Sequence, residues 1–185
     1  MLLRRLAAIW RQFRGEIHAK INPIGYARSI GVTVGENVHF YGMPSGMFGT
    51  EPWLITIGNN VHVTSGVTFV THDGGTLILR KEVPDLEWTA PIRIGNDVYI
   101  GIRTIILPGV TIGDRCIIGA GSVVSRSIPG NSVAVGVPAR VIKTVDEYLE
   151  QMKKKSLGCG HLAGLEKEAV LKRLFGITTK ASVLK

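Results

Sequence analysis

The sequence has few aromatic residues, few cysteines and no long apolar run. Aromatic side chains make up only 6% of the 185 residues, which is low for a core built on rings. Two cysteines, Cys116 and Cys159, are too few for a disulfide framework and fit a reducing compartment. No apolar run approaches the roughly 18 residues of a membrane span. These absences exclude a disulfide scaffold and a chain that spans a membrane.

The amino-terminal sequence MLLRRLAAIWRQFRG also lacks the unbroken apolar stretch of a secretory signal, because arginine interrupts it repeatedly. Hydrophobic residues make up 45% of the chain and charged residues 19%, a composition that excludes disorder for most of it. A mass of 20.0 kDa is enough for one sizeable core and too little for two ordinary domains. We therefore expect a cytoplasmic protein with one main domain.

The net charge of +8 comes entirely from the two ends of the chain. Residues 1–20 contain five Arg and Lys against one acid, and residues 143–185 contain nine against five. The intervening residues 21–142 hold eight of each sign. Nucleic-acid-binding proteins more often carry their charge on a face of the body, so we expect no nucleic acid partner. Basic ends fit a membrane-surface contact or simple solvation equally well.

A six-residue repeat is the dominant pattern. Counting in sixes from Ile94 gives only branched aliphatic residues, and the position after each one is mostly glycine. The aliphatic positions are Ile94, Ile100, Ile106, Ile112, Ile118 and Val124. Earlier segments repeat the pattern at Ile57, Val63 and Phe69, and more faintly at Val34. A helix would repeat apolar residues every three or four positions, and a half-buried strand every two.

This period predicts a β-solenoid in which three hexapeptides form one triangular coil of about 18 residues. The aliphatic side chains point into the prism and stack between coils, and we expect the small residues to allow bending at the corners. A β-sandwich with coincidental spacing is the alternative, and six consecutive matches argue against it.

Residues 91–143 carry a specific resemblance: PIRIGNDVYIGIRTIILPGVTIGDRCIIGAGSVVSRSIPGNSVAVGVPARVIK. This run resembles the hexapeptide-repeat acyltransferases, and its VPARVIK ending looks like the acetyl-CoA-dependent sugar and xenobiotic acetyltransferase branch. The resemblance implies an all-β solenoid, the left-handed parallel β-helix, assembled as a homotrimer with clefts between subunits. We expect the β-helix at residues 25–143. It would follow an amphipathic segment at 1–24 and precede a helical extension at 144–185.

Two interruptions break the repeat, at residues 41–56 and 71–91. Insertions in a solenoid loop out of one face, often the working face, so we expect both to project and form the rim of a cleft. In the first, Glu51 and Trp53 are candidates for contacting a polar acceptor. The second begins with THDGG, in which two glycines are expected to let the backbone turn sharply.

His72, in this THDGG segment, is the candidate catalytic residue. In the resembling family, a histidine at the root of such a loop is the general base. It takes a proton from an acceptor hydroxyl or amine, which attacks the thioester of acetyl-CoA. An imidazole with an unperturbed pKa of about 6.5 suits this role at neutral pH. Acidic loop residues that would orient it are Asp73, Glu82, Asp85 and Glu87, and a backbone carbonyl would also serve. Asp73, Asp85 and Glu87 are in addition candidates for contacting the acceptor.

The resemblance also implies a coenzyme groove that runs parallel to the prism axis between subunits. The matching positions are Tyr99, Ile102 and Ala120 for the pantetheine arm, Ser125 and Arg126 near the nucleotide, and Arg140 and Lys143 for phosphates. Ile102 is bulkier than the small or hydroxyl residue that is usual there. We expect no metal. Zinc enzymes on the same solenoid need three histidines, two of them close together, and His62 and His72 have no close partner.

Helices are expected at both ends. Residues 2–14 place six apolar side chains at helical spacing with arginines between them, which predicts a short amphipathic helix. We favour packing of this helix across the open end of the solenoid or on a neighbouring subunit. The alternative is that this helix lies on an anionic membrane surface, near a lipid-linked glycan. Two further helices are predicted at residues 145–155 and 165–175.

Together these features predict an acetyltransferase that uses acetyl-CoA. The expected acceptor is a nucleotide-linked amino sugar or a hydroxyl of a surface-glycan precursor in polysaccharide biosynthesis. A serine acetyltransferase-like enzyme is an alternative, although that family has a long helical amino-terminal domain and only about 20 residues precede the repeat here. A non-catalytic scaffold is a second alternative, which Ile102 favours.

Overall fold

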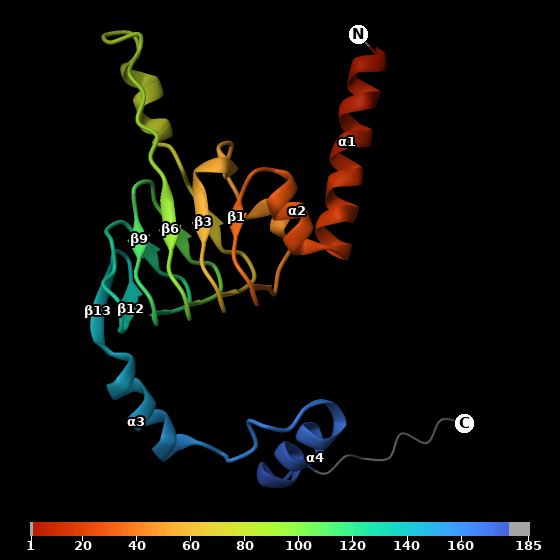
Figure 1. The fold of residues 1–185 in the computed structure, drawn as a ribbon, viewed down its shortest axis with the longest axis vertical. Helices are drawn as coiled ribbons and strands as arrows, with labels where there is room; N and C mark the ends of the chain where they lie inside the picture. Colours follow the sequence, from red (N-terminus) through yellow and green to blue (C-terminus); the bar gives the residue numbers. More distant parts are fainter. Residues whose placement is uncertain (1, 178–185) are drawn as a thin grey trace. The chain divides into compact units, whose positions relative to one another are not determined.

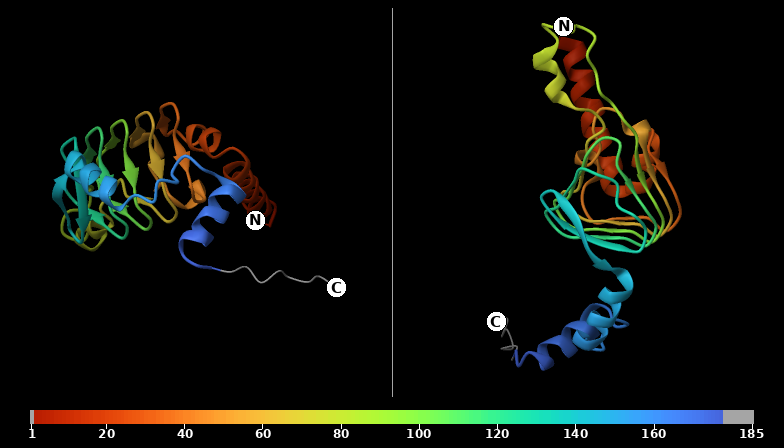
Figure 2. Two further views of the ribbon diagram at one scale, coloured as in Figure 1. Left: turned by 90° about the horizontal axis from the view of Figure 1, so that it is seen from below. Right: turned by 90° about the vertical axis from the view of Figure 1, so that its left-hand side faces the viewer.

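The computed structural model describes residues 2–177. The chain divides into two compact units, the first ending at Tyr148 and the second beginning at Leu149. In the first unit, short parallel strands wind into stacked coils with three sides (Figure 1, Figure 2). The β-solenoid that the six-residue period predicts is therefore confirmed.

Each side of the prism is one sheet. The first sheet contains β1 (Thr33–Val34), β3 (Ile55–Ile57), β6 (Ile92–Ile94) and β9 (Thr111–Ile112). The second contains β2 (His39–Phe40), β4 (His62–Val63), β7 (Tyr99–Ile100), β10 (Ile117–Ile118), β12 (Ser132–Gly136) and β13 (Ala139–Thr144). The third contains β5 (Thr68–Phe69), β8 (Ile105–Ile106) and β11 (Val123–Val124). The second corner is the turn between the second and third sheets, and the third corner is the turn between the third and first.

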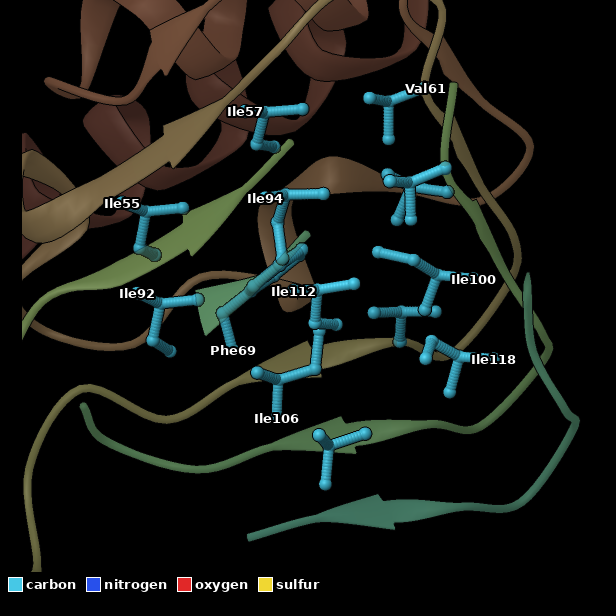
Figure 3. Packing of buried hydrophobic residues seen from close by; sticks show 14 of the residues in the cluster. Ile55, Ile57, Val61, Phe69, Ile92, Ile94, Ile100, Ile106, Ile112 and Ile118 are labelled. Atoms are coloured by element: carbon cyan, nitrogen blue, oxygen red, sulfur yellow. The ribbon is translucent and has the colours of Figure 1, made fainter. Parts of the chain in front are cut away.

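The repeat aliphatics form the core. Ile94 pairs with Ile112, and Ile100 with Ile118, so each inward side chain lies over its counterpart one coil away. Figure 3 shows these side chains stacked inside the prism. The positions four residues after each aliphatic are also buried: Val98, Thr104, Val110, Cys116, Ser122 and Ile128. Burial on this scale, at about 25 cal/mol per Å² of apolar surface, accounts for why coils must stack to be stable.

The glycine after each aliphatic has a different role from the expected one. Gly58, Gly95 and Gly101 are not among the residues with positive φ, so they are not required for the bend. A methyl group on Gly58 would instead lie 2.6 Å from the carbonyl oxygen of Gly95, and one on Gly101 would lie 2.5 Å from the amide nitrogen of Ala120. The glycines are therefore needed because neighbouring coils approach closely at these corners.

Polar side chains join the coils at the turn between the first and second sheets. The amide N–H of Asn59 donates to Asn96 Oδ1 at 2.9 Å, and that of Asn96 donates to Asp114 Oδ1 at 2.6 Å. The N–H of Glu36 donates to Asn59 Oδ1 in the same way at 2.8 Å. This ladder satisfies backbone donors that the strands leave unpaired at the corner.

The two interruptions differ from each other. The first contains two short 3-10 helices, η1 (Pro44–Gly46) and η2 (Pro52–Leu54), but it does not simply project. Met47 is buried, and Phe48 bridges to Phe69 and stacks on its ring, so this segment supplies the third side of the first coil. The second interruption does project from the prism and contains η3 (Gly74–Leu79) (Figure 1).

The amino-terminal helix is longer than expected, and another element covers the end of the prism. The helix α1 spans Leu2–Ile21, and a second helix, α2 (Pro23–Ser29), follows it at once. Asn22 caps α2 by accepting from the N–H of Gly25 at 2.8 Å. Ala27 of α2 is fully buried and belongs to the core cluster. The helix α2 therefore covers the open end of the solenoid, and the packing expected for residues 2–14 stays a prediction. Side chains 2–9, 11 and 12 lie outside those that the structure describes.

The carboxyl-terminal end of the prism is closed by strand β13, which pairs antiparallel with β12. The predicted helices follow as α3 (Val145–Lys155) and α4 (Gly164–Leu174). Thr144 and Glu147 form a capping box at the start of α3. Glu147 Oε2 accepts from the amide of Thr144, and Thr144 Oγ1 accepts from the amide of Glu147.

Candidate functional site

The register of the first coil places Glu51 beside His72. Because Phe48 bridges in parallel to Phe69, the residues three positions further along each segment also come together. The distance from Glu51 Oε2 to His72 Nδ1 is 2.9 Å. A carboxylate from the first interruption therefore meets the imidazole at the root of the second. Sequence reasoning offered carboxylates of the second interruption or a backbone carbonyl as the partner, and the structure has Glu51 in that place.

Three donors converge on the Glu51 carboxylate. The Thr50 hydroxyl donates to Oε1 at 2.6 Å, and the buried Thr71 hydroxyl and His72 Nδ1 donate to Oε2 at 2.6 and 2.9 Å. These bonds, that of Thr50 first, lower the pKa of Glu51 from 4.5 to about 2. Glu51 is therefore ionised at neutral pH.

An ionised carboxylate accepts hydrogen bonds and cannot donate one, so the proton shared with Glu51 belongs to Nδ1 of His72. In the neutral imidazole, the other ring nitrogen, Nε2, then carries the lone pair. This tautomer is the one that a general base acting through Nε2 requires. The imidazole is 37% exposed, so a small molecule has access to it.

Backbone pairing closes the stem of the second loop around His72. His72 bridges antiparallel to Thr89, the N–H of Asp73 donates to the carbonyl of Trp88, and that of Ala90 donates to the carbonyl of Thr71. The turn after His72 is stabilised by the Asp73 side chain, whose Oδ1 accepts from the amide N–H of Gly75 at 2.9 Å. The two glycines of THDGG are not among the positive-φ residues, so their expected role in a sharp turn is wrong.

A groove of about 190 Å³ lies against this pair. Its lining comprises Thr50, Glu51, His72, Asp73, Gly74, Thr76, Leu77, Arg80 and Glu87. Three carboxylates and one guanidinium give these residues a negative balance, and the only apolar side chain is that of Leu77. Sequence reasoning missed Thr50, Thr71 and Arg80. Recognition of Phe48 as the repeat position that pairs with Phe69 would have placed Thr50 and Thr71 at this site.

The other expected acceptor contacts have mixed outcomes. Glu87 lines the groove, but its carboxylate already accepts from Arg80 and, at 2.8 Å, from the Thr89 hydroxyl. It therefore closes the loop stem. Asp85 is exposed and does not line the groove. Trp53 is 64% exposed, lies beside Gly31 and is also absent from the lining.

The coenzyme candidates lie at several places on the prism. Tyr99 is exposed on the second sheet, and Ile102 and Ala120 are exposed one coil apart at the second corner. The carbonyl of Ile102 already accepts from the N–H of Gly121 at 2.7 Å. Within one protomer, the second corner and His72, at the third corner, are separated by the width of the third sheet.

The basic candidates are on the outside of the fold. Ser125 and Arg126 are exposed at the third corner, the corner from which His72 also projects. Arg140 and Lys143 lie on β13, and Arg140 is exposed, with Nη1 donating to the carbonyl of Ala139 at 3.0 Å. Exposed guanidinium groups with remaining donors suit phosphate oxygens.

The described residues, 2–177, offer neither a metal-binding cluster nor a membrane-spanning helix. No group of three or more His, Cys, Asp or Glu side chains in this part of the chain is arranged to hold a metal ion. No helix among the same residues is long and apolar enough to cross a membrane.

Comparison with known proteins identifies the family. Residues 91–126 match the model for the bacterial transferase hexapeptide, six repeats. The chain is 50% identical over 121 residues to protein CapG of Staphylococcus aureus, covering 65% of this chain and 70% of CapG. It is 46% identical over 98 residues to galactoside O-acetyltransferase of Escherichia coli K12, covering 52% of this chain but only 47% of that enzyme.

A solved structure supports the fold class alone. The crystal structure of a hexapeptide-repeat-containing acetyltransferase from Vibrio cholerae aligns with a TM-score of 0.58 at 22% identity, covering 74% of this chain and 89% of that one. The expected left-handed parallel β-helix is thereby confirmed. The repeat, the fold and the relatives agree, and the chain belongs to the hexapeptide-repeat acetyltransferase family.

Proposed function

We propose that the protein transfers an acetyl group from acetyl-CoA to a hydroxyl or amine of a sugar, with His72 as the general base. The observation that carries the proposal is the bond between Glu51 and His72 at the rim of the groove. A non-catalytic scaffold has no need of a carboxylate with three donors that holds one histidine tautomer. Similarity to galactoside O-acetyltransferase supports a sugar acceptor.

In the proposed reaction, His72 Nε2 removes the proton from the acceptor hydroxyl or amine. The freed lone pair attacks the thioester carbonyl carbon, the carbon–sulfur bond breaks, and the coenzyme leaves as a thiol after taking a proton. Glu51 holds the imidazole and stabilises its positive charge while the proton is on Nε2. Positioned base catalysis of this kind contributes about 10²–10⁴-fold to the rate.

The groove lining favours an acceptor without negative charge near the reacting atom. Glu51, Asp73 and Glu87 outnumber the single cation Arg80, and Arg80 is already paired. A carboxylate on the acceptor would therefore be repelled beside the base. The proposal favours a neutral sugar hydroxyl or an amino sugar, as a free glycoside, a nucleotide-linked sugar or a surface-glycan precursor.

The coenzyme fits best between subunits. The second corner with Ile102 and Ala120 does not meet the third corner with His72 inside one protomer, so we propose a homotrimer in which neighbouring chains supply the two walls. Tyr99 would flank the pantetheine arm. Four further candidates would hold the nucleotide and phosphates: Ser125, Arg126, Arg140 and Lys143.

A thiol-release assay tests this function. The protein is mixed with acetyl-CoA and with neutral glycosides, amino sugars, nucleotide-linked amino sugars, uronic acids or serine. The proposal expects release with a neutral or amino sugar, and little with uronic acids. Calorimetry with acetyl-CoA is run in parallel. Absence of specific binding would support a scaffold, and turnover confined to serine would contradict the sugar assignment.

A further inference from the structure

We propose that α1 is a docking surface for an anionic lipid membrane. The inference goes beyond acetyl transfer and does not rest on it. The large apolar residues Trp10, Phe13, Ile17 and Ile21 are 64%, 55%, 43% and 78% exposed. Their spacing of three, four and four residues places them on one face of the helix. Trp10 and Phe13 contact each other edge to face, with ring centroids 6.4 Å apart.

Of the four stripe residues, Ile17 lines a groove of about 940 Å³ with residues of α2 and η1, and Trp10, Phe13 and Ile21 are not part of that lining. Among the side chains of α1 that the structure describes, that of Ala19 is the buried one. It is two positions beyond Ile17, and at 3.6 residues per turn the two point to roughly opposite sides of the helix. The helix packs on α2 and η1, and in the described part of the chain Trp10, Phe13 and Ile21 belong neither to that groove lining nor to the core cluster.

Charge decides which partner fits. Residues 1–20 contain five Arg and Lys and one Glu, so the segment carries a formal charge of +4. Arg14 and Lys20 are both exposed. Two or three copies of this helix packed side by side would bring like charges together, which opposes a second copy as the partner. A surface rich in anionic lipid is complementary to both the charge and the apolar stripe.

Helix geometry fits a surface position. A helix of 20 residues is about 30 Å long, close to the thickness of the hydrocarbon core, but its many cations prevent it from spanning. Lying flat, the helix buries the stripe at the lipid interface, where tryptophan is favoured, and leaves Arg14 and Lys20 near the head groups. Docking of this kind would hold the groove near acceptors that are carried on lipid.

Co-sedimentation of the full chain with vesicles tests the proposal. We expect at least about tenfold stronger partition into phosphatidylcholine–phosphatidylglycerol vesicles than into phosphatidylcholine alone, and weaker binding as salt is raised. Phe13→Glu should abolish most of this binding. Replacing Arg14 and Lys20 by Gln should weaken it by about fivefold for each charge. The matched control is Leu165→Glu, which changes an exposed leucine on α4 in the same way and should bind like the unchanged protein.

Two further measurements keep the outcome clear. Phe13→Glu should leave the oligomeric state in light scattering and acetyl transfer to a soluble acceptor unchanged. Equal binding to neutral and anionic vesicles, or no binding to either, would overturn the proposal. Loss of oligomerisation in Phe13→Glu would also overturn it, and would assign the stripe to a second copy of the chain.

Discussion

At the scale of single residues, the chemistry of the site depends on how Glu51 is held. Its carboxylate has three donors, and two of them are threonine hydroxyls that hold it ionised and oriented. The carboxylate in turn selects the histidine tautomer with the lone pair on Nε2. Under the proposed function Glu51 is a positioning residue, and its removal should affect the rate more than binding.

Glu51→Gln should lower kcat by roughly 10²-fold or more, because an amide NH₂ that donates to Nδ1 would move the imidazole proton to Nε2. KM for acetyl-CoA should change little. Glu36→Gln, at an exposed carboxylate, is the control. Unchanged kcat in Glu51→Gln would show that the contact is not part of catalysis.

Glu51 should also make stability depend on pH. Its pKa is about 2 in the folded protein and near 4.5 when unfolded, so the unfolded chain takes up the proton first as acid is added. The stabilisation is complete above about pH 4.5 and is lost as pH falls toward 2. Urea unfolding across this range should show a smaller slope of stability against pH in Glu51→Gln. Identical slopes would contradict the lowered pKa.

The position of His72 at the root of the second loop was predictable because the break in the repeat is visible in the sequence. The contact with Glu51 was not predictable. Phe48 comes eight positions after Phe40, whereas in a regular coil the step is six positions, as from Val63 to Phe69. That two-residue excess hides the third side of the first coil. The roles expected for Trp53 and Asp85 rested on membership of a loop, and side-chain direction within an irregular loop is set by local contacts that no periodicity reports.

At the scale of elements, the six-residue period predicted the coils and their 18-residue register because stacking requires one inward side chain at the same place in each turn. The period did not predict α2, which depends on the Asn22 cap and on the burial of Ala27 at the open end. The bending role that we expected for the glycine after each aliphatic residue is wrong, and the close approach of successive coils explains the glycine instead.

Gly58→Ala should destabilise the fold by about 1–3 kcal/mol, because its methyl group would meet backbone atoms of the next coil at 2.6–2.8 Å. Denaturant unfolding measures the change. Gly46→Ala is the matched control, since a methyl there meets nothing within 4 Å and should shift stability by no more than about 0.5 kcal/mol. Equal effects of the two substitutions would contradict the close-approach explanation.

At the scale of the whole molecule, the proposed site needs two corners of the prism that one chain holds apart. If neighbouring subunits supply the two walls, two inactive variants should complement each other. Trimers mixed from His72→Ala and Ala120→Glu chains should regain up to about a quarter of the sites, because an intact pair of walls forms at that frequency. Separately purified variants should remain inactive. Absence of any recovery in verified mixed trimers would place the whole site in one chain.

The most direct test of the account is acetyl transfer by His72→Ala, measured beside calorimetric binding of acetyl-CoA to the same variant. The account predicts that transfer falls by about 10²-fold or more while acetyl-CoA binding and assembly are unchanged, because only the proton acceptor is lost. Transfer at the rate of the unchanged protein would contradict the assignment of His72 as the base.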